Sequence, residues 1–296
     1  MSQACNICPR KCGVSRSEQV GFCGVGEEIR VARAALHPWE EPCISGKGGS
    51  GTIFFCGCNL RCVFCQNREI SHGENRGKAV DANTLAGMML RLRDAGADNI
   101  NLVTPTHYTE QLLPVLERVR PLLNIPIVYN CGGYESVETL RRLNGLVDVY
   151  LPDAKYYSSD LSARYSAAPD YFEVLLSALR EMLRQTGKPQ LDENGMLVRG
   201  VLVRHMVLPA CRKDSAALLH ALFESFGNDA FLLSLMSQYT PAFAAGSADK
   251  NLHRRVTTFE YNAVCAVADA LGFEGFTQAR TSAEQAYTLN FREEVF

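Results

Sequence analysis

The chain has 296 residues, of which 47% are hydrophobic and 21% charged, and its formal net charge at pH 7 is -2. A chain of this length buries enough apolar surface to fold without cross-links, so its twelve cysteines are not needed as disulfides. The 30 basic residues are balanced by 32 acidic ones. The composition therefore excludes a charge-driven binder of nucleic acid, and we expect no nucleic-acid partner.

The beginning of the chain lacks the basic and then apolar layout of a secretory signal. No apolar run approaches the roughly 18 residues that a membrane helix needs, so we expect no membrane partner. We predict a cytoplasmic protein, in which clustered thiols are typical of metal or redox chemistry. Nine of the twelve cysteines fall within the first 65 residues.

From Thr52 onward, apolar runs alternate with segments of helical periodicity. The runs are continuous, as in strands of a parallel sheet that is covered on its faces. Predicted strands are residues 52–56, 99–104, 126–130, 147–151, 201–208 and 231–236. Predicted helices follow Asp81, contain Leu112 to Val119, contain Leu218 to Leu222, and run from Thr258 to Leu271.

This alternation predicts right-handed crossovers and an α/β fold. Six to eight such units would curl into a full or partial barrel with its chemistry at the carboxyl ends of the strands, and an open doubly wound sheet is the alternative. Residues 1–51 are rich in Cys, Gly and Pro and are predicted to be a metal-binding extension, followed by a core domain at 52–296. Residues 189–195 are predicted to be a polar turn.

The loop after the first predicted strand reads CGCNLRCVFCQN, in which three residues separate Cys58 from Cys62 and two separate Cys62 from Cys65. Three thiolates on one 4Fe-4S cluster leave one iron without a protein ligand. A cluster that only carries electrons usually has four protein ligands, one for each iron. The alternative is a zinc site that takes Cys56 or His72 as its fourth ligand.

With this motif, and with the segments CNICPRKCGVSR, NINLVTPTHY and LPDAKYY, the chain resembles the radical S-adenosylmethionine (SAM) superfamily. Within it, the chain is similar to pyruvate formate-lyase-activating enzyme. The resemblance implies a partial (β/α)6 barrel and an oxidoreductase that cleaves SAM reductively at the cluster to methionine and a 5′-deoxyadenosyl radical. It also implies a reductant such as flavodoxin or ferredoxin as partner.

The resemblance suggests that the substrate is a glycine of a glycyl radical enzyme. The alternative is radical modification of another protein, a peptide or a metabolite. An alternative of another class is a non-catalytic iron–sulfur or zinc protein that serves as electron carrier or scaffold. Fold and cluster alone do not decide among them.

Cofactor contacts are predicted at the ends of several strands. Most of the superfamily has a Gly-Gly-Glu motif after the second strand, where this chain has Thr104, Thr106 and His107, whose side chains offer hydrogen-bonding atoms for SAM. A simple turn around Pro105 is the alternative.

Asp153 and Lys155 are similar to the Asp-x-Lys element of the activators, and they are the predicted catalytic and SAM-binding pair. An ordinary ion pair is the alternative. Arg204 and His205 are expected to face the same barrel mouth, and Tyr239 is expected to stack on adenine.

A second site is predicted from the amino-terminal cysteines Cys5, Cys8, Cys12 and Cys23. Four thiolates close a tetrahedral zinc site, and they equally suit a second iron–sulfur cluster. Spacing does not choose between these two metals. Cys43 and Cys56 stay unassigned.

Overall fold

The computed structural model describes residues 4–74, 76–277 and 291. Its strands are β1 (Ile29–His37), β2 (Ser50–Phe55), β3 (Lys78–Val80), β4 (Asn99–Val103), β5 (Ile127–Cys131), β6 (Val149–Pro152), β7 (Gln190–Leu191), β8 (Leu197–Met206), β9 (Leu232–Met236) and β10 (Gly275–Thr277). Within the described residues they form one sheet in the order β10-β9-β8-β6-β5-β4-β2-β1-β3, and β7 pairs with β8.

All neighbouring strands from β2 to β10 along this order are parallel. β1 lies antiparallel to β2, and β3 lies antiparallel to β1. Every residue of β4, β5 and β6 is buried, as expected for strands that are covered on both faces. The six predicted strands and the α/β fold are confirmed.

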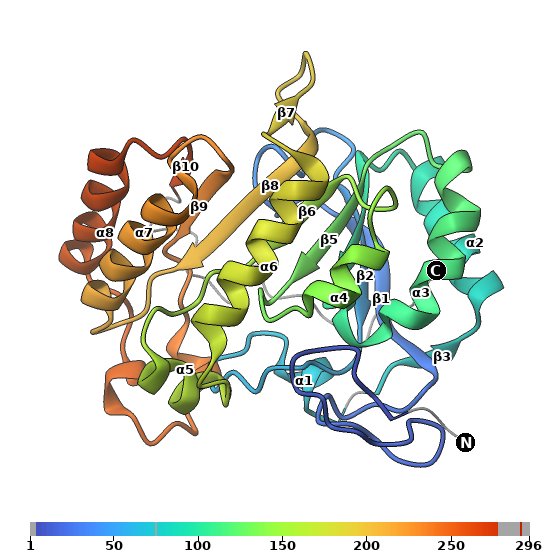
Figure 1. Ribbon diagram of the computed structural model, residues 1–296, viewed down its shortest axis with the longest axis horizontal. Helices are drawn as coiled ribbons and strands as arrows, with labels where there is room; N and C mark the ends of the chain where they lie inside the picture. The colour runs from blue at the N-terminus through green and yellow to red at the C-terminus, as the bar shows by residue number, and fades with distance from the viewer. Residues whose placement is uncertain (1–3, 75, 278–290, 292–296) are drawn as a thin grey trace.

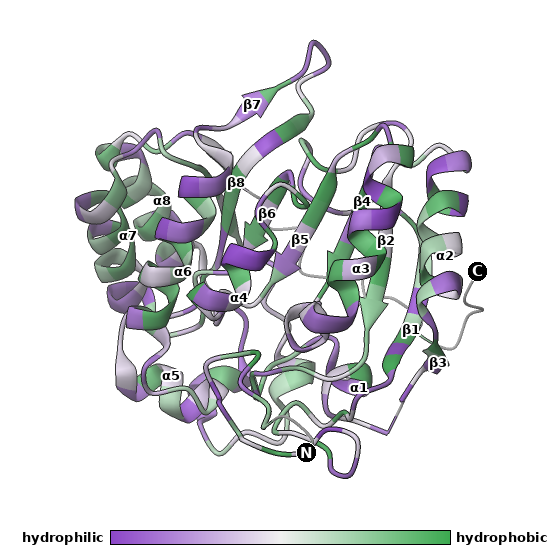
Figure 2. Ribbon diagram, turned by 45° about the vertical axis from the view of Figure 1, so that its right-hand side comes forward, coloured by the Kyte–Doolittle hydropathy of each residue, from purple (hydrophilic) through white to green (hydrophobic). Residues whose placement is uncertain are grey.

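The helices are α1 (Arg68–Ser71), α2 (Ala82–Asp94), α3 (Thr109–Val119), α4 (Val137–Arg142), α5 (Ser159–Ser166), α6 (Tyr171–Thr186), α7 (Arg212–Phe226) and α8 (Thr258–Leu271). The four predicted helices correspond to α2, α3, α7 and α8. α2 begins as expected, because the Asp81 carboxylate accepts the backbone N–H of Thr84 at 2.7 Å. The apolar strands lie beneath helices whose outer sides are polar (Figure 2).

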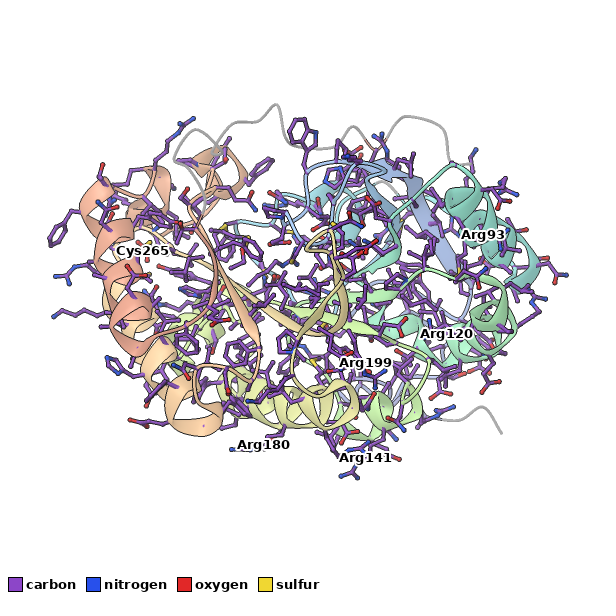
Figure 3. All side chains as sticks on the ribbon, turned by 90° about the horizontal axis from the view of Figure 1, so that it is seen from above. Arg93, Arg120, Arg141, Arg180, Arg199 and Cys265 are labelled. Carbon is purple, nitrogen blue, oxygen red and sulfur yellow. The ribbon has the colours of Figure 1, made fainter. Side chains whose placement is uncertain are left out.

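The sheet curves, and the helices lie along its outer side (Figures 1 and 3). This arrangement is the predicted partial barrel. The strand arrows of β5 and β8 point to the end of the sheet where the amino-terminal segment, α1 and α5 lie (Figure 1). No helix in the described part of the chain is long and apolar enough to cross a membrane.

Apolar clusters on both faces hold the sheet. The largest one joins the sheet to its helices and contains Tyr129, Tyr150 and Leu179. A smaller cluster comprises Cys43, Ile44, Val128, Val149, Leu151, Leu197 and Leu202. Side chains alternate along a strand, so Val128 and Tyr129 point to opposite faces of the sheet. Val128 points to the inner face of the curved sheet. We call the space on this face the lumen.

Some elements differ from the sequence predictions. β1 lies inside the predicted extension but pairs with β2 in the core sheet, with Ala34 opposite Ile53. The domain boundary at residue 51 stays a prediction. β7 occupies part of the predicted turn at 189–195, and β3, β10 and four short or amphipathic helices (α1, α4, α5 and α6) were not predicted. The end of the predicted core domain, 278–290 and 292–296, lies outside the described residues.

Candidate active site

The loop that follows β2 places three cysteines on one cavity. Gly57 opens the loop with a φ of +86°, and a Cβ there would lie 2.7 Å from the carbonyl oxygen of Cys23. Cys58, Cys62 and Cys65 line a cavity of about 560 Å³. This volume is within the usual range for a small-molecule site. The spacing of the motif and the fold therefore bring the three thiols to one place.

The environment of these thiols opposes their ionisation when no metal is bound. Burial, with the neighbouring sulfurs of Cys62 and Cys65, raises the pKa of Cys58 above its ordinary value. Burial and Cys62 raise the pKa of Cys65 to about 11. Contacts of the sulfurs help to restrain the loop: the Leu60 N–H donates to Cys58 Sγ at 3.4 Å, and Cys62 Sγ lies 2.9 Å from Ser166 Oγ. Cysteine binds metals as the thiolate, and at this buried position the thiolate form needs a metal cation to stabilise it.

The three thiols fit a cluster better than a single ion. A cubic cluster binds each thiolate at a different iron, so its ligands line a volume and do not meet at a point. Neither Cys56 nor His72, the possible fourth zinc ligands, lines the cavity. The geometry favours the cluster.

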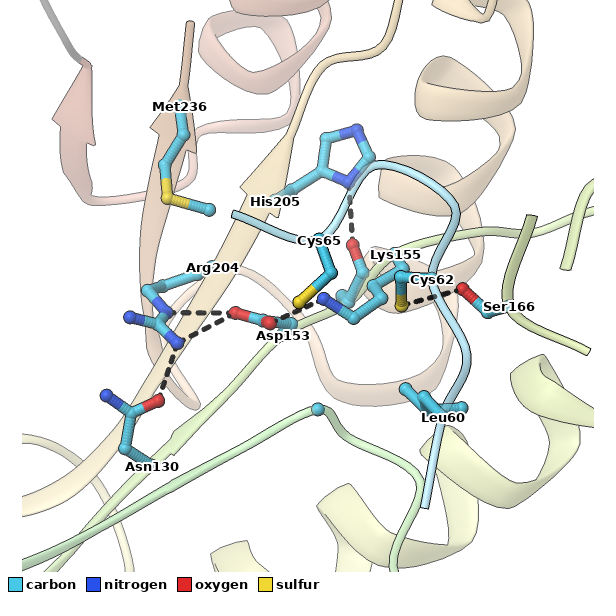
Figure 4. Close-up of polar contacts among 12 residues, drawn as sticks. Leu60, Cys62, Cys65, Asn130, Asp153, Lys155, Ser166, Arg204, His205 and Met236 are labelled. Carbon is cyan, nitrogen blue, oxygen red and sulfur yellow. Dashed lines mark hydrogen bonds and ion pairs between the residues drawn. The ribbon is translucent and has the colours of Figure 1, made fainter. Parts of the chain in front are cut away.

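A charged network lines the same cavity as the cysteine loop. Asp153 accepts Lys155 Nζ at 2.6 Å through one carboxylate oxygen and Arg204 Nε at 2.9 Å through the other (Figure 4). Arg204 also donates to Asn130 Oδ1 at 2.6 Å. The cavity is lined by all four residues of this network: Asn130, Asp153, Lys155 and Arg204. The carboxyl ends of β5, β6 and β8 therefore meet at the cavity, as predicted for parallel strands.

Charge outweighs burial in this network. Burial would raise the pKa of Asp153, but Arg204 and Lys155 hold it below its ordinary value. Burial would lower the pKa of Lys155, but the Asp153 carboxylate and the sulfur of Cys62 raise it above its ordinary value. Tyr171 fixes the turn, because its hydroxyl accepts the Lys155 N–H at 3.1 Å and lies 2.6 Å from the Asp153 carbonyl oxygen. The pair stays ionised at neutral pH.

The residues after β4 separate into two groups. Thr104 lines the cavity and has a φ of +59°. Thr106 and His107 do not line it: Thr106 Oγ1 donates to the Glu135 carboxylate at 2.7 Å, and His107 Nε2 lies 2.8 Å from the Cys56 carbonyl oxygen. The expectation that Thr106 and His107 contact SAM differs from the structure, because a short 3-10 helix (Thr106–Tyr108) turns them into the core.

Two further expectations have opposite outcomes. Tyr239 lines the cavity, and its hydroxyl donates to the Leu252 carbonyl oxygen at 2.6 Å, so the ring is held in the wall. His205 was expected at the mouth, but it is buried behind the sheet, where its ring nitrogens lie 2.7 Å from the Ala154 carbonyl oxygen and 2.8 Å from Ser215 Oγ. Side chains alternate along β8, so Arg204 and His205 cannot face the same side.

The amino-terminal cysteines form a second group beside the cluster loop. The Cys5 and Cys12 thiols are near enough to shift each other's pKa, and a Cβ at Gly21 would lie 3.3 Å from Cys12 Sγ and 3.5 Å from Cys23 Sγ. Burial raises the pKa of Cys8 to about 12. The Cys58 N–H donates to the Cys23 carbonyl oxygen at 3.1 Å, so the two cysteine groups are adjacent.

Several lining residues were missed by the sequence analysis. Asn130 had a usable signal, since it is a polar residue at the end of an apolar run. Glu40 and Glu41 had none, because they belong to the connection between β1 and β2 and not to a strand end. They enter the cavity from a segment that was expected to be separate from the core.

Comparison with known proteins identifies the family. A family model described as the radical SAM superfamily matches residues 52–204. An uncharacterized protein of Methanocaldococcus jannaschii is 30% identical over 275 residues, which cover 90% of this chain and 74% of that protein.

Solved structures with the same fold are more distant in sequence. A radical SAM methyltransferase from Sphaerobacter thermophilus is 16% identical with a TM-score of 0.53, over 77% of this chain and 66% of that one. SuiB of Streptococcus suis, solved with SAM bound, is 13% identical with a TM-score of 0.50, over 75% of this chain and 48% of that one. The chain thus spans less than two thirds of either protein. Since the family model matches more than half of the sequence, the chain belongs to the radical SAM superfamily.

Proposed function

We propose that this protein binds a 4Fe-4S cluster through Cys58, Cys62 and Cys65 and uses it to cleave SAM reductively. The supporting observation is that the three thiols line one cavity with the ionised pair of Asp153 and Lys155. When bound, the cluster and SAM supply a 5′-deoxyadenosyl radical that abstracts a hydrogen atom from the substrate. Flavodoxin or ferredoxin is the proposed electron donor.

The cavity residues are assigned the tasks of binding and orientation. Lys155 has ammonium donors beyond the one bonded to Asp153, and these would bind the carboxylate of SAM or a substrate backbone. Asp153 and Arg204 hold the Lys155 ammonium in position. The Thr104 hydroxyl would accept or donate one hydrogen bond, and the restrained ring of Tyr239 would stack on adenine.

The proposed substrate is a glycine of a glycyl radical enzyme, as in the activase to which the sequence is similar. Modification of another protein, a peptide or a metabolite is the second candidate. SuiB, which shares the fold, has been solved with a precursor peptide bound. A cavity at the open carboxyl ends of the strands is compatible with a polypeptide segment.

The proposal is tested by anaerobic reconstitution with iron and sulfide, followed by reduction with dithionite in the presence of SAM. We expect about four irons at this site and formation of 5′-deoxyadenosine, both lost in Cys58→Ala, Cys62→Ala and Cys65→Ala. Cys265→Ala is the matched control, since Cys265 lies on α8 away from the cavity. A filled cluster that gives no 5′-deoxyadenosine would instead support the electron carrier.

For the amino-terminal group we propose a second metal site, either zinc or an iron–sulfur cluster. Its support is the proximity of four thiols in a short segment that has little apolar core of its own. Metal analysis of Cys5→Ala and Cys12→Ala decides between the two metals. Loss of zinc with all iron retained excludes a second cluster, and loss of iron beyond the catalytic cluster excludes zinc.

A further inference from the structure

The connection between β1 and β2, residues 38–49, enters the lumen. The Cys43 carbonyl oxygen accepts the Leu197 N–H at 2.8 Å, and Ile44 is fully buried in the same apolar cluster as Val128. These contacts anchor the segment on the inner face of the sheet. The two glutamates that precede them, Glu40 and Glu41, are therefore carried into the cavity.

Glu40 is fully partnered in the lumen. Its carboxylate accepts Arg204 Nη1 at 3.4 Å and Asn101 Nδ2 at 3.2 Å. Arg204 bridges Glu40 and Asp153, and Asp153 also holds Lys155. Two cations and two carboxylates thus neutralise each other within this network.

Glu41 makes no ion pair with this network. Glu41 is 6% exposed and lines the cavity, and its Oε2 has no hydrogen-bond partner among the residues that the structure describes. Arg204 attracts this carboxylate but makes no hydrogen bond to it. Among the described residues that line the cavity, the two permanent cations are already paired with Asp153 and Glu40, and burial raises the pKa of Glu41 to about 7. A buried carboxylate oxygen without a donor is costly, and a ligand that brings a donor removes that cost.

Glu41 and the cysteines approach the cavity from opposite ends of β2. His37, just before the connection, pairs with Ser50 at the start of β2, whereas Cys58 follows Phe55 at its end. A strand rises about 3.3 Å per residue, so these two ends are roughly 17 Å apart. Glu41 thus lines the same cavity from the segment at the amino end of β2, near enough to Arg204 and Asp153 for their charges to act on its carboxylate.

We propose that the substrate carries a cationic group, an ammonium or a guanidinium, and that Glu41 binds this group in the lumen. The inference rests on the proposed function, because it names the substrate class of the same cavity. A basic side chain of a peptide and a small amine both supply this chemistry. The charge-assisted hydrogen bond would place the rest of the substrate toward the cysteine end.

The test is a binding measurement without turnover on the anaerobically reconstituted protein. The probes are Nα-acetyl-lysine N-methylamide and its norleucine counterpart, and the corresponding arginine and citrulline pair. We expect wild type to bind the cationic member of at least one pair about tenfold more tightly. Glu41→Gln, which keeps the shape and removes the charge, should lose this preference. Glu117→Gln, an exposed change on α3, should keep it.

Three results would overturn the inference. If wild type binds both members of each pair equally, the substrate does not carry a cationic group that this cavity recognises. A preference that survives in Glu41→Gln assigns the recognition to another group. A loss of SAM affinity in Glu41→Gln with unchanged preference assigns Glu41 to the cofactor. Each is read separately from 5′-deoxyadenosine formation, so failure of the proposed cleavage reaction is distinguishable.

Discussion

Glu135 is a buried acid that lies outside the cavity yet touches the segment after β4. It is 2% exposed, and its carboxylate accepts Thr106 Oγ1 at 2.7 Å and the Tyr129 hydroxyl at 3.2 Å. Burial raises the pKa of Glu135 from its ordinary 4.5 to about 8. The folded chain therefore holds a proton on Glu135 at neutral pH, which the unfolded chain releases.

This difference predicts how stability depends on pH. Between pH 4.5 and 8 the folded state binds more protons at Glu135 than the unfolded state, so the free energy of unfolding falls as the pH rises across that window. Each pH unit costs at most about 1.4 kcal/mol. Chemical denaturation from pH 5 to 8 should show a weaker decline for Glu135→Gln than for wild type. An identical decline would contradict the prediction, and Glu138→Gln, an exposed neighbour, should follow wild type.

Individual site residues were predictable to different degrees. The cysteine spacing and the Asp-x-Lys pair indicated residues that do line the cavity. Thr106 and His107 were misjudged because one turn of helix after β4 decides their direction, and sequence does not encode that turn visibly. Glu41 was missed because an acidic residue between prolines is usually solvated, and only the tertiary fold buries it.

At the scale of elements, the cluster loop and the amino-terminal segment approach closely at Gly57. A Cβ there would meet the Cys23 carbonyl oxygen at 2.7 Å and Val25 Cγ1 at 2.9 Å. Gly57→Ala should destabilise the fold by about 1–3 kcal/mol and reduce the iron retained at the cluster site.

Gly145→Ala is the control that distinguishes backbone strain at a positive φ from steric crowding of the added Cβ. Gly145 has a φ of +82°, close to that of Gly57, but a Cβ there meets no atom of the described residues within 4 Å. It should therefore cost only about 1 kcal/mol, from the left-handed backbone, and keep all its iron. Equal iron loss in both variants, measured by iron analysis after reconstitution, would show that crowding at Gly57 is unimportant.

Elements were predictable where one signal dominated. The parallel strands are short apolar runs, and α8 was predicted at its observed bounds, where the structure shows Thr257 as the capping residue. β1 was missed because its polar and apolar residues are mixed in a segment read as a cysteine-rich extension. Its strand state comes from pairing with β2, which is a tertiary contact.

At the scale of the whole molecule, the partial barrel is filled from inside by its own chain. Ile44 is fully buried among residues of β5, β6 and β8. Ile44→Ala should leave a cavity in the lumen and lower the free energy of unfolding by about 2–5 kcal/mol. Val20→Ala, at a position 63% exposed, should change it by less than about 0.5 kcal/mol. Denaturant titration of both variants checks this, and a small effect at Ile44 would mean that the segment is loosely held.

The connection through the lumen also affects the order in which parts of the molecule can fold. Glu40 and Arg204, which bond in the cavity, are separated by 164 positions. During synthesis the amino-terminal residues emerge long before β8, and contacts between distant positions form slowly. Until β8 arrives, Glu40 and Asp153 have no arginine to neutralise them. Assembly of the charged network is thus a late folding event, and the cysteines emerge while the lumen is still open to metal and to oxidants.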